Sequence, residues 1–373
     1  MRILLLSSVE HDSGSALRFR VLAGALARRG HDVHLLEPVP PGTRPETPPG
    51  VHRHPCPRLP VRPELQAPLW LLHGVGAVFR LRPEVCWSLK ALPNAWLPAV
   101  LARRLGARIA VDVDDLDEAY YPAGTTRRII REFFEWAVSS ADDVTTHTEP
   151  LRARIAELRA GRDGSVFVDQ AIDVDRFAGA ARSEALASSL GLDDGPVLLY
   201  AGHLGPASDL GPLLKALRIV AAERSDVRLL VVGDGRDRTR LEAVAAHDLP
   251  RGFARFVGAV PHADVAGYYA LARVALNYLE DTEANRHRAS IKVREALAAG
   301  LPVVTSRTPD SERFAEFVRF PDEPGPVAFA AAVLRELDAT DREPARRAAE
   351  WLAIHGTADV AIREIAERWE ARA

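Results

Sequence analysis

Residues 286–304 read RHRASIKVREALAAGLPVV, and this stretch decides how the whole chain is interpreted. Ser290 is a preferred helix N-cap residue, and a helix beginning after it would end at Gly300, because Pro302 cannot continue it. Lys292 would lie in the first turn, where a cation opposes the helix dipole at a cost of about 0.3–1 kcal/mol. The chain has 48 basic residues, of which only three are lysines: Lys90, Lys215 and Lys292. A bias toward Arg, Ala and Pro makes this rarity a weak signal by itself.

An anionic ligand at the helix start would explain Lys292, because free backbone N–H groups and a compact point charge both suit a diphosphate. Glu295 follows on the same helix face, and a carboxylate can accept two hydrogen bonds from the hydroxyls of a ribose. The pattern therefore indicates a nucleotide site. The alternative is an exposed ion pair between Lys292 and Glu295, worth about a few tenths of a kcal/mol.

The sequence on both sides alternates short apolar runs, typical of strands in a parallel sheet, with segments of helical periodicity. In the first half we expect strands at 2–8, 31–38, 84–89, 107–115 and 142–147. The pattern then restarts, with strands expected at 196–202, 227–235, 254–260, 274–280 and 301–306. This alternation predicts an α/β fold of two Rossmann-like, doubly wound parallel-sheet domains that face each other across a cleft.

We place the N-terminal domain at 1–178 and the C-terminal domain at 179–346, with a helix at about 347–373 that packs back onto the first domain. A chain of 373 residues suits two domains of ordinary size. The segment 38–68 is too rich in proline for central strands.

The composition is typical of a soluble globular protein and excludes several classes. The chain is 47% hydrophobic and 27% charged with a formal net charge of −3, so nothing points to nucleic acid. No apolar run reaches the roughly 18 residues of a membrane span. Residues 2–8 lack the features of a signal peptide, and two cysteines, Cys56 and Cys86, fit a reducing compartment. We therefore expect a cytoplasmic protein.

The motif S-I-K-x-x-E-A-L-A-A-G-L-P-V-V at 290–304 resembles the donor site of glycosyltransferases with the two-domain GT-B fold. It is most similar to the retaining group known as family four, or group 1. Further segments resemble that family in the same order along the chain: RGHDV (29–33), ADDVTTHTEPLRARI (141–155), QAIDVDRF (170–177), YAGHLGPASDLGPLLKAL (200–217), LLVVGDG (229–235) and FVGAVP (256–261).

The resemblance implies a role for each matching position. Lys292 and the backbone at Ser290 and Ile291 would hold a donor diphosphate, and Glu295 would hold the ribose. The other implied positions are Val257 and Gly258 beside the base, Gly202 and Gly233 where backbone approaches the ligand, and Gly14 facing the phosphates from the N-terminal domain. The donor would be a UDP-, GDP- or ADP-linked sugar, bound by the C-terminal domain without a metal or other cofactor. The acceptor, of unknown identity, would bind the N-terminal domain.

Within the donor site, the sequence departs from the family pattern at two places. The first of two glutamates that relatives carry seven residues apart is replaced by His287, although Asn285 fits a subgroup that lacks it. A basic residue that clamps the phosphates after Gly202 is also missing, and the nearest matches are His203 and Ser208. The arginines beside the helix start, Arg286 and Arg288, could replace it.

Four aspartates follow the strand expected at 107–115: Asp112, Asp114, Asp115 and Asp117. Asp114 or Asp115 is a candidate for catalysis or acceptor binding. A magnesium site and a solvated loop are the alternatives.

Other patterns carry weaker hypotheses. Arg18 could meet an acceptor or phosphate, or lie on a solvated helix face. His52, His54 and Cys56 alternate like zinc ligands, but no fourth ligand is apparent. The apolar segment 67–79 could contact a membrane or a lipid acceptor through Trp70, Leu71, Leu72 and Phe79, or pack in the core. No phosphate-binding P-loop, serine-hydrolase elbow or complete dinucleotide fingerprint is present.

The sequence as a whole predicts a transferase that moves a sugar from a nucleotide-diphosphate sugar to an acceptor hydroxyl, with retention. Lys292, a nearby arginine and the helix N-terminus would stabilise the departing diphosphate. The candidates for a catalytic role are Asp114, Asp115 and Lys292. A non-catalytic nucleotide-sugar-binding subunit and a nucleotide-sugar epimerase are the alternatives.

Overall fold

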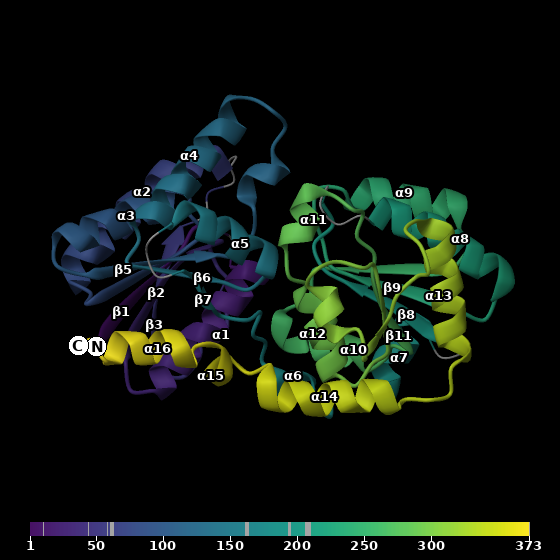
Figure 1. Ribbon diagram of the computed structural model, residues 1–373. Helices are drawn as coiled ribbons and strands as arrows, with labels where there is room; N and C mark the ends of the chain where they lie inside the picture. Colours follow the sequence, from purple (N-terminus) through teal and green to yellow (C-terminus); the bar gives the residue numbers. More distant parts are fainter. Residues whose placement is uncertain are drawn as a thin grey trace. The chain divides into compact units, whose positions relative to one another are not determined.

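The computed structural model describes residues 1–9, 11–43, 45–57, 59, 63–160, 164–192, 195–205 and 210–372. Contacts divide the chain into two compact units (Figure 1). Unit 1 comprises Met1–Ile172, His287–Ala289 and Gly356–Ala373, and unit 2 comprises Asp173–Arg286 and Ser290–His355. The chain thus leaves unit 1 shortly before the boundary expected at 178 and returns to it later than 347.

Unit 1 is built on a parallel sheet. Its described strands lie in the order β3 (Val51–Pro57), β2 (Asp32–Val39), β1 (Arg2–Ser7), β4 (Val85–Leu89), β5 (Arg108–Val113), β6 (Asp143–Thr146) and β7 (Val166–Phe167). The central strands are buried on both faces, which explains their continuous apolar runs. The proline-rich segment supplies only the edge strand β3, where Pro55 and Pro57 are tolerated because one side of the strand has no hydrogen-bonding neighbour.

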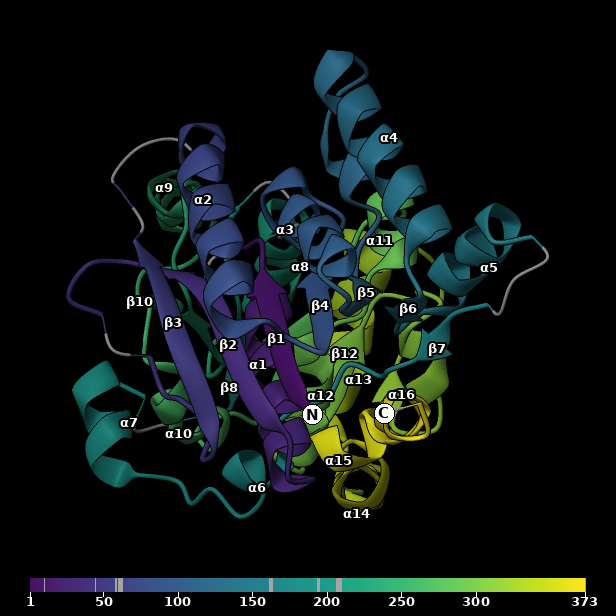
Figure 2. The ribbon, with the colours of Figure 1, turned by 90° about the vertical axis from the view of Figure 1, so that its left-hand side faces the viewer.

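Helices cover both faces of this sheet. They are α1 (Gly14–Arg28), α2 (Pro63–Leu81), α3 (Pro93–Arg104), the 3-10 helix η1 (Asp117–Tyr120), α4 (Thr125–Ser140), α5 (Glu149–Leu158), α15 (Ala358–Ala361) and α16 (Arg363–Glu370). Alternate residues of β1 point to opposite faces. Ile3 and Leu5 pack with α1, α15 and α16, whereas Leu4 and Leu6 pack with α2, α3, α4 and α5. Figure 2 shows α2, α3 and α4 beside the sheet.

Unit 2 repeats the architecture with its own core. Its strands are also parallel, in the order β10 (Ala254–Gly258), β9 (Arg228–Val232), β8 (Val197–Ala201), β11 (Val274–Asn277), β12 (Val303–Thr305) and β13 (Val318–Arg319). The helices are α6 (Val174–Phe177), α7 (Glu184–Leu190), α8 (Leu210–Glu223), α9 (Arg238–Asp248), η3 (His262–Asp264), α10 (Val265–Tyr269), α11 (Glu283–His287), α12 (Ile291–Ala298), η4 (Ser311–Phe314), α13 (Pro326–Asp338) and α14 (Glu343–His355). The core is formed mainly by β8, β9 and β11 with α8 and α13.

The apolar segment 67–79 lies in α2 and divides between two environments. Trp70 is buried and its indole N–H donates to the Pro57 carbonyl at 3.2 Å, whereas Leu72 and Phe79 are exposed. In the described part of the chain, no helix combines the length and hydropathy needed to cross a bilayer. Within those same residues, no three His, Cys, Asp or Glu side chains are arranged to hold a metal, so the zinc hypothesis for His52, His54 and Cys56 finds no support.

Candidate active site

The helix predicted from residues 286–304 is present as α12, and its N-terminus has no side-chain cap. Ser290 is the N-cap residue, but its hydroxyl donates to Asn277 Oδ1 at 3.3 Å and makes no cap bond. The Ser290 N–H donates to Asp310 at 3.0 Å. No acidic residue lies in the first turn, so the N–H groups there remain available to an anion.

Lys292 stands at the carboxyl end of β8. Its Nζ lies 3.3 Å from the Tyr200 hydroxyl and 4.4 Å from the centre of the Tyr200 ring. A Cβ added to Gly202 would lie 3.1 Å from this ammonium. Among the residues the structure describes, no carboxylate pairs with Lys292. The ion pair with Glu295, considered as the alternative from the sequence, is therefore wrong.

Glu295 is held by two other side chains. One carboxylate oxygen accepts a hydrogen bond from the Tyr269 hydroxyl at 2.9 Å, and the other lies 3.0 Å from His262 Nε2. Burial, together with the charge of Glu295, raises the pKa of Tyr269 well above its usual value, so the phenol stays protonated and donates. Each carboxylate oxygen keeps a lone pair for a further donor such as a ribose hydroxyl.

Three glycines bring the ends of β8, β9 and β10 together. Gly233 has φ +141°, and a Cβ there would lie 1.9 Å from the Gly202 carbonyl oxygen, so only glycine fits. The Gly233 N–H donates to the Gly258 carbonyl at 2.9 Å. Val257, beside Gly258, is half-buried. The structure thus brings Gly202, Gly233 and Gly258 together at the carboxyl ends of β8, β9 and β10. Their contact with a base or phosphate stays a prediction.

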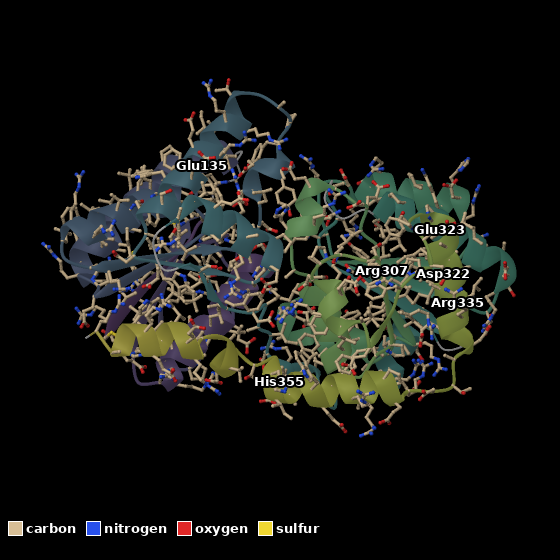
Figure 3. All side chains as sticks on the ribbon, viewed as in Figure 1. Glu135, Arg307, Asp322, Glu323, Arg335 and His355 are labelled. Carbon is tan, nitrogen blue, oxygen red and sulfur yellow. The ribbon has the colours of Figure 1, made fainter. Side chains whose placement is uncertain are left out.

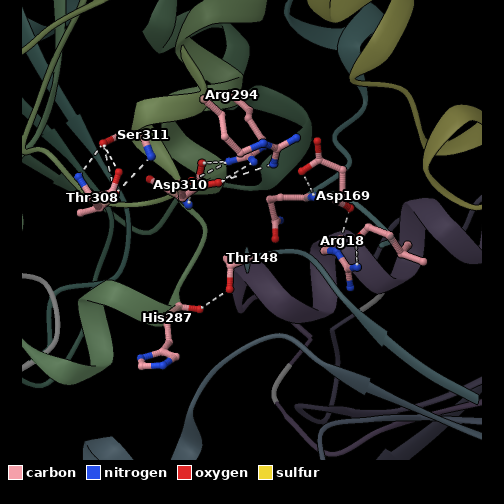
Figure 4. A network of polar contacts seen from close by, with 12 residues as sticks. Arg18, Thr148, Asp169, His287, Arg294, Thr308, Asp310 and Ser311 are labelled. Atoms are coloured by element: carbon pink, nitrogen blue, oxygen red, sulfur yellow. Dashed lines mark hydrogen bonds and ion pairs between the residues drawn. The ribbon is translucent and has the colours of Figure 1, made fainter. Parts of the chain in front are cut away.

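A buried ion pair missed by the sequence reasoning fixes the start of α12 (Figure 4). Arg294 donates twice to Asp310, at 2.9 and 2.7 Å, with both side chains at most 2% exposed. Arg294 also donates to the Ser290 carbonyl at 3.3 Å, and its guanidinium lies 4.9 Å from the Phe314 ring. Since Asp310 also accepts from the Ser290 N–H, the pair anchors the first turn to the loop after β12.

The residues predicted to clamp the phosphates differ in their exposure and contacts. Arg286 is exposed and forms an ion pair with Asp281 at 2.5 Å. Arg288 is half-buried near the helix start, and His203 is exposed after Gly202. Ser208 lies outside the described residues. None of these is tested as a clamp. Asn285 is buried and donates to the Glu280 carbonyl at 2.9 Å, so its amide supports the turn that precedes α11.

In unit 1, Arg18 has a structural role that both sequence interpretations missed. Its side chain is fully buried and pairs with Asp112 at 2.5 Å. It also donates to the carbonyls of Val168 and Asp169 (Figure 4). Asp112 accepts a second hydrogen bond from Thr145 at 2.5 Å. Arg18 therefore joins α1 to β5 inside the domain and is neither a cleft residue nor a solvated one.

The remaining aspartates surround Lys90, the other lysine of interest. Its Nζ lies 2.7 Å from Asp114, 3.1 Å from Asp115 and 2.9 Å from Asp117. Lys90 directly follows β4 and has φ +64°, an uncommon conformation for a residue with a side chain. The solvated-loop alternative for this run is wrong, because Asp114 is buried and all three carboxylates contact Lys90. The ammonium also occupies the position between carboxylates that a magnesium ion would take.

Charges in this cluster are strongly perturbed. Burial raises the pKa of Asp117 to about 7, although Lys90 acts in the opposite direction. Burial alone would also raise the pKa of Asp114, but Lys90 and His147 hold it below the usual value. A side-chain hydrogen bond from Ser15 supports the Asp114 carboxylate too. Gly14 begins α1 beside Ser15, so the first βα loop lies at this cluster.

Comparison with known proteins identifies the class. Residues 13–168 match the glycosyl transferase 4-like domain, and residues 195–339 match the family described as glycosyl transferases group 1. A GDP-mannose-dependent alpha-mannosyltransferase of Mycolicibacterium smegmatis is 28% identical over 75% of this chain and 72% of its own. A 2-deoxystreptamine glucosyltransferase of Streptomyces kanamyceticus is 31% identical over 58% of this chain and 56% of its own.

Solved structures agree on the fold. A sucrose-phosphate synthase from Thermosynechococcus elongatus superimposes with a TM-score of 0.77 at 18% identity, covering all of both chains. Anabaena HepE in complex with UDP and glucose gives a TM-score of 0.75 at 15% identity, again over both whole chains. The two glycosyltransferase domain models at 13–168 and 195–339, together with the shared GT-B fold, confirm the predicted resemblance to group 1 glycosyltransferases and the predicted enzyme class.

Proposed function

We propose that this glycosyltransferase takes a sugar from a nucleotide-diphosphate sugar and attaches it, with retention, to an acceptor hydroxyl. The observation that carries the proposal is the Lys292 ammonium, which has no carboxylate partner among the described residues and stands beside Gly202 at the open N-terminus of α12. Glu295, fixed on the same helix, supplies acceptor oxygens for a ribose. The spacing of one cation and one carboxylate on a helix start suits a nucleoside diphosphate.

In the proposed reaction, the bond between the anomeric carbon and the diphosphate oxygen breaks, and a bond from that carbon to the acceptor oxygen forms. Lys292 and the first turn of α12 stabilise the negative charge that develops on the leaving diphosphate. The proton of the acceptor hydroxyl passes to the departing phosphate. We assign acceptor binding to unit 1, with Asp115 as the candidate contact because its side chain is more exposed than that of Asp114.

Among the three donor bases expected from the sequence, guanine has support from the relatives. The M. smegmatis protein and a Mycobacterium tuberculosis protein, 34% identical over 36% of this chain, are both named GDP-mannose-dependent. The HepE structure contains UDP, so UDP is the second candidate. We place the reaction in the cytoplasm because Cys56 and Cys86 are both free thiols.

Binding of UDP, GDP and ADP, measured by calorimetry, tests the donor site. Lys292→Ala and Glu295→Ala should each lower the affinity for the preferred nucleoside diphosphate by about ten-fold or more. The reason is that a hydrogen bond to a charged group contributes about 1.5–3 kcal/mol. Lys215→Ala is the matched control, because Lys215 is an exposed lysine on α8 of the same unit.

Equal affinity for the wild type, Lys292→Ala and Lys215→Ala would reject the proposed site. Transfer is tested separately by incubating the corresponding nucleotide sugar with candidate acceptors and identifying the products. Conversion of the donor sugar to its epimer without an acceptor would replace the proposal with the epimerase alternative.

A further inference from the structure

Three histidines of unit 1 lie on one face of the strands β2 and β3, and the proposed transfer reaction uses none of them. The two strands are parallel neighbours whose register sets His34 beside His52 and Leu36 beside His54. His34 and Leu36 are two residues apart and share a face, which is the face that α2 covers. His34 is buried, His54 is half-buried and His52 is exposed. The His34 ring stacks on the other two, with ring centres 5.0 and 5.2 Å apart.

Hydrogen bonds join two of these histidines to α2 and to the start of β2. His34 Nδ1 lies 2.9 Å from His54 Nε2. Beyond His54, a guanidinium nitrogen of Arg80 in α2 lies 3.3 Å from His54 Nδ1. Beyond His34, a carboxylate oxygen of Asp32 lies 3.2 Å from His34 Nε2. We call these four residues the histidine chain.

The direction of each bond in the histidine chain follows from the arginine at its end. Arginine has donors only, so His54 Nδ1 accepts from Arg80 and carries no proton. A neutral imidazole has one N–H, which in His54 is then on Nε2 and donates to His34 Nδ1. The N–H of His34 is therefore on Nε2 and donates to Asp32. Both imidazoles are neutral in this arrangement, and their neighbours decide which nitrogen holds the proton.

A second proton on either ring breaks the histidine chain. On His54 it would go to Nδ1, opposite the N–H groups and the positive charge of Arg80. On His34 it would also go to Nδ1, opposite the N–H of His54. The pKa of both histidines lies below the ordinary value of 6.5, chiefly because burial disfavours the charged ring. Each histidine also lowers the pKa of His54 or His34 in turn through its own charge, as His52 does for both.

The other charged groups around the histidine chain oppose one another. Asp32 favours the protonated form of His34, but its second carboxylate oxygen is paired with Arg2 of β1 at 2.9 Å. His52 Nε2 lies 3.7 Å from the Asp32 oxygen that His34 contacts, so it competes for the same negative charge. Positive groups therefore face the chain from β1, β3 and α2, against the carboxylate of Asp32. This arrangement favours the neutral rings.

We propose that the histidine chain is a pH-sensitive latch, which holds the edge strand β3 and helix α2 to β2 and opens when acid protonates His34 or His54. The Trp70 indole of α2 donates to the Pro57 carbonyl at the end of β3, so the two elements would loosen together. Above about pH 6.5 the latch is closed. As the pH falls below that value, the open form binds protons that the closed form excludes. The equilibrium constant for opening then rises by up to about ten-fold per pH unit for each histidine.

Hydrogen exchange of the full chain, measured by mass spectrometry, tests the latch. Exchange rates are expressed as protection factors, which remove the intrinsic effect of pH on exchange. From about pH 7.5 to about pH 5.5, protection of the β3 and α2 amides should fall at least ten-fold, whereas protection of β1 should not change. Glutamine offers a donor and an acceptor but takes no proton, so H34Q/H54Q should show equal protection at both pH values.

The single variant H54Q changes only a half-buried position, and its fall in protection should be at least three-fold smaller than that of the wild type. It decides the test if thermal unfolding shows that H34Q/H54Q is not folded. His355→Gln is the matched control, because His355 is exposed at the end of α14 in unit 2 (Figure 3). This control should behave like the wild type.

Three results would overturn the latch: constant protection of β3 and α2 in the wild type, a fall of wild-type size in the glutamine variants, or an equal fall in β1. The last result would mean that acid loosens the whole unit and not its edge. The assay contains no nucleotide, so its outcome is independent of the proposed transfer reaction.

Discussion

Glu295 shows how a single carboxylate is prepared for a ligand. Tyr269 and His262 each contact one of its oxygens, so the plane of the carboxylate is fixed before any nucleotide binds. Tyr269→Phe removes one of these contacts and leaves the fold of α10 intact. We expect about ten-fold weaker binding of the preferred nucleoside diphosphate, the usual effect of losing a hydrogen bond to a charged group.

The proper comparison for that variant is the 2′,3′-dideoxy form of the same nucleotide. Tyr269→Phe should change its affinity little, because the ribose hydroxyls that Glu295 would hold are absent. Calorimetry on the four combinations measures the coupling. An equal loss for both ligands would show that Tyr269 acts on the whole site and not through Glu295.

Asp117 makes stability depend on pH. Its pKa is about 7 in the folded protein, above the ordinary value of 3.8, because of burial. Between about pH 4 and pH 7 the folded state therefore binds a proton that the unfolded state has lost, and this group's contribution to stability falls as pH rises. Asp117→Asn should remove that contribution. Urea unfolding should show the variant gaining stability relative to the wild type from pH 5 to pH 8, and a constant difference would refute the assignment.

Residues close in sequence were predictable, and residues joined only by the fold were not. Lys292 and Glu295 occupy one helical turn, so their shared face followed from spacing. Lys90 and Asp115 are 25 residues apart and meet because β4 and β5 are neighbours in the sheet. The only sequence signal for this contact was that Lys90 is one of three lysines in the chain. This signal was weak, because the overall bias toward arginine makes every lysine rare. Nothing in the sequence indicated that Arg18 is buried, because a buried arginine and a surface arginine look alike in a sequence.

At the scale of elements, α12 can bind a diphosphate only if its first turn is held in place. The buried ion pair between Arg294 and Asp310 holds it. Arg294→Met keeps the apolar stem but leaves a buried aspartate without its cation. Urea unfolding should show a loss of about 3–5 kcal/mol, the cost of breaking one partner of a buried ion pair.

Arg286→Ala is the matched control for that experiment, because its ion pair with Asp281 is exposed on both sides. Its free energy of unfolding should change by at most about 1 kcal/mol. Should Arg286→Ala destabilise the protein as much as Arg294→Met, burial would not be the cause. A loss of nucleotide affinity in Arg286→Ala without loss of stability would support its predicted role as a phosphate clamp.

Strands with a long apolar run could be predicted from the sequence, and very short strands could not. The central strands β1, β8 and β9 are unbroken apolar runs, and their predicted limits differ from the observed ones by few residues. β7 and β13 are two residues long and carry no pattern that distinguishes them from loops. The C-terminal segment was expected as one helix from 347, but the chain turns at Gly356, and α14 stays with unit 2 while α15 and α16 join unit 1.

At the scale of the whole molecule, each unit closes its own hydrophobic core. Among the described residues, the main core cluster of unit 2 lies between Leu198 and Leu337. One face of unit 1 is completed by the last residues of the chain, where Trp369 packs edge-on against Trp87 with ring centres 5.4 Å apart. The Trp369 indole also donates to the buried Asp143 at 2.9 Å. Two separate cores imply that the units can unfold separately.

Trp369→Ala tests this organisation. It removes a side chain that is 2% exposed, and a cavity of that size costs about 3–5 kcal/mol. Because Trp369 packs in the core of unit 1, scanning calorimetry should show the unit 1 transition lowered and the unit 2 transition unchanged. Trp351→Ala is the reciprocal control, since Trp351 packs against Phe314 and Phe317 of unit 2. A nucleotide bound at α12 should raise only the unit 2 transition. One transition shifted equally by both variants would mean that the two cores unfold as a single cooperative body.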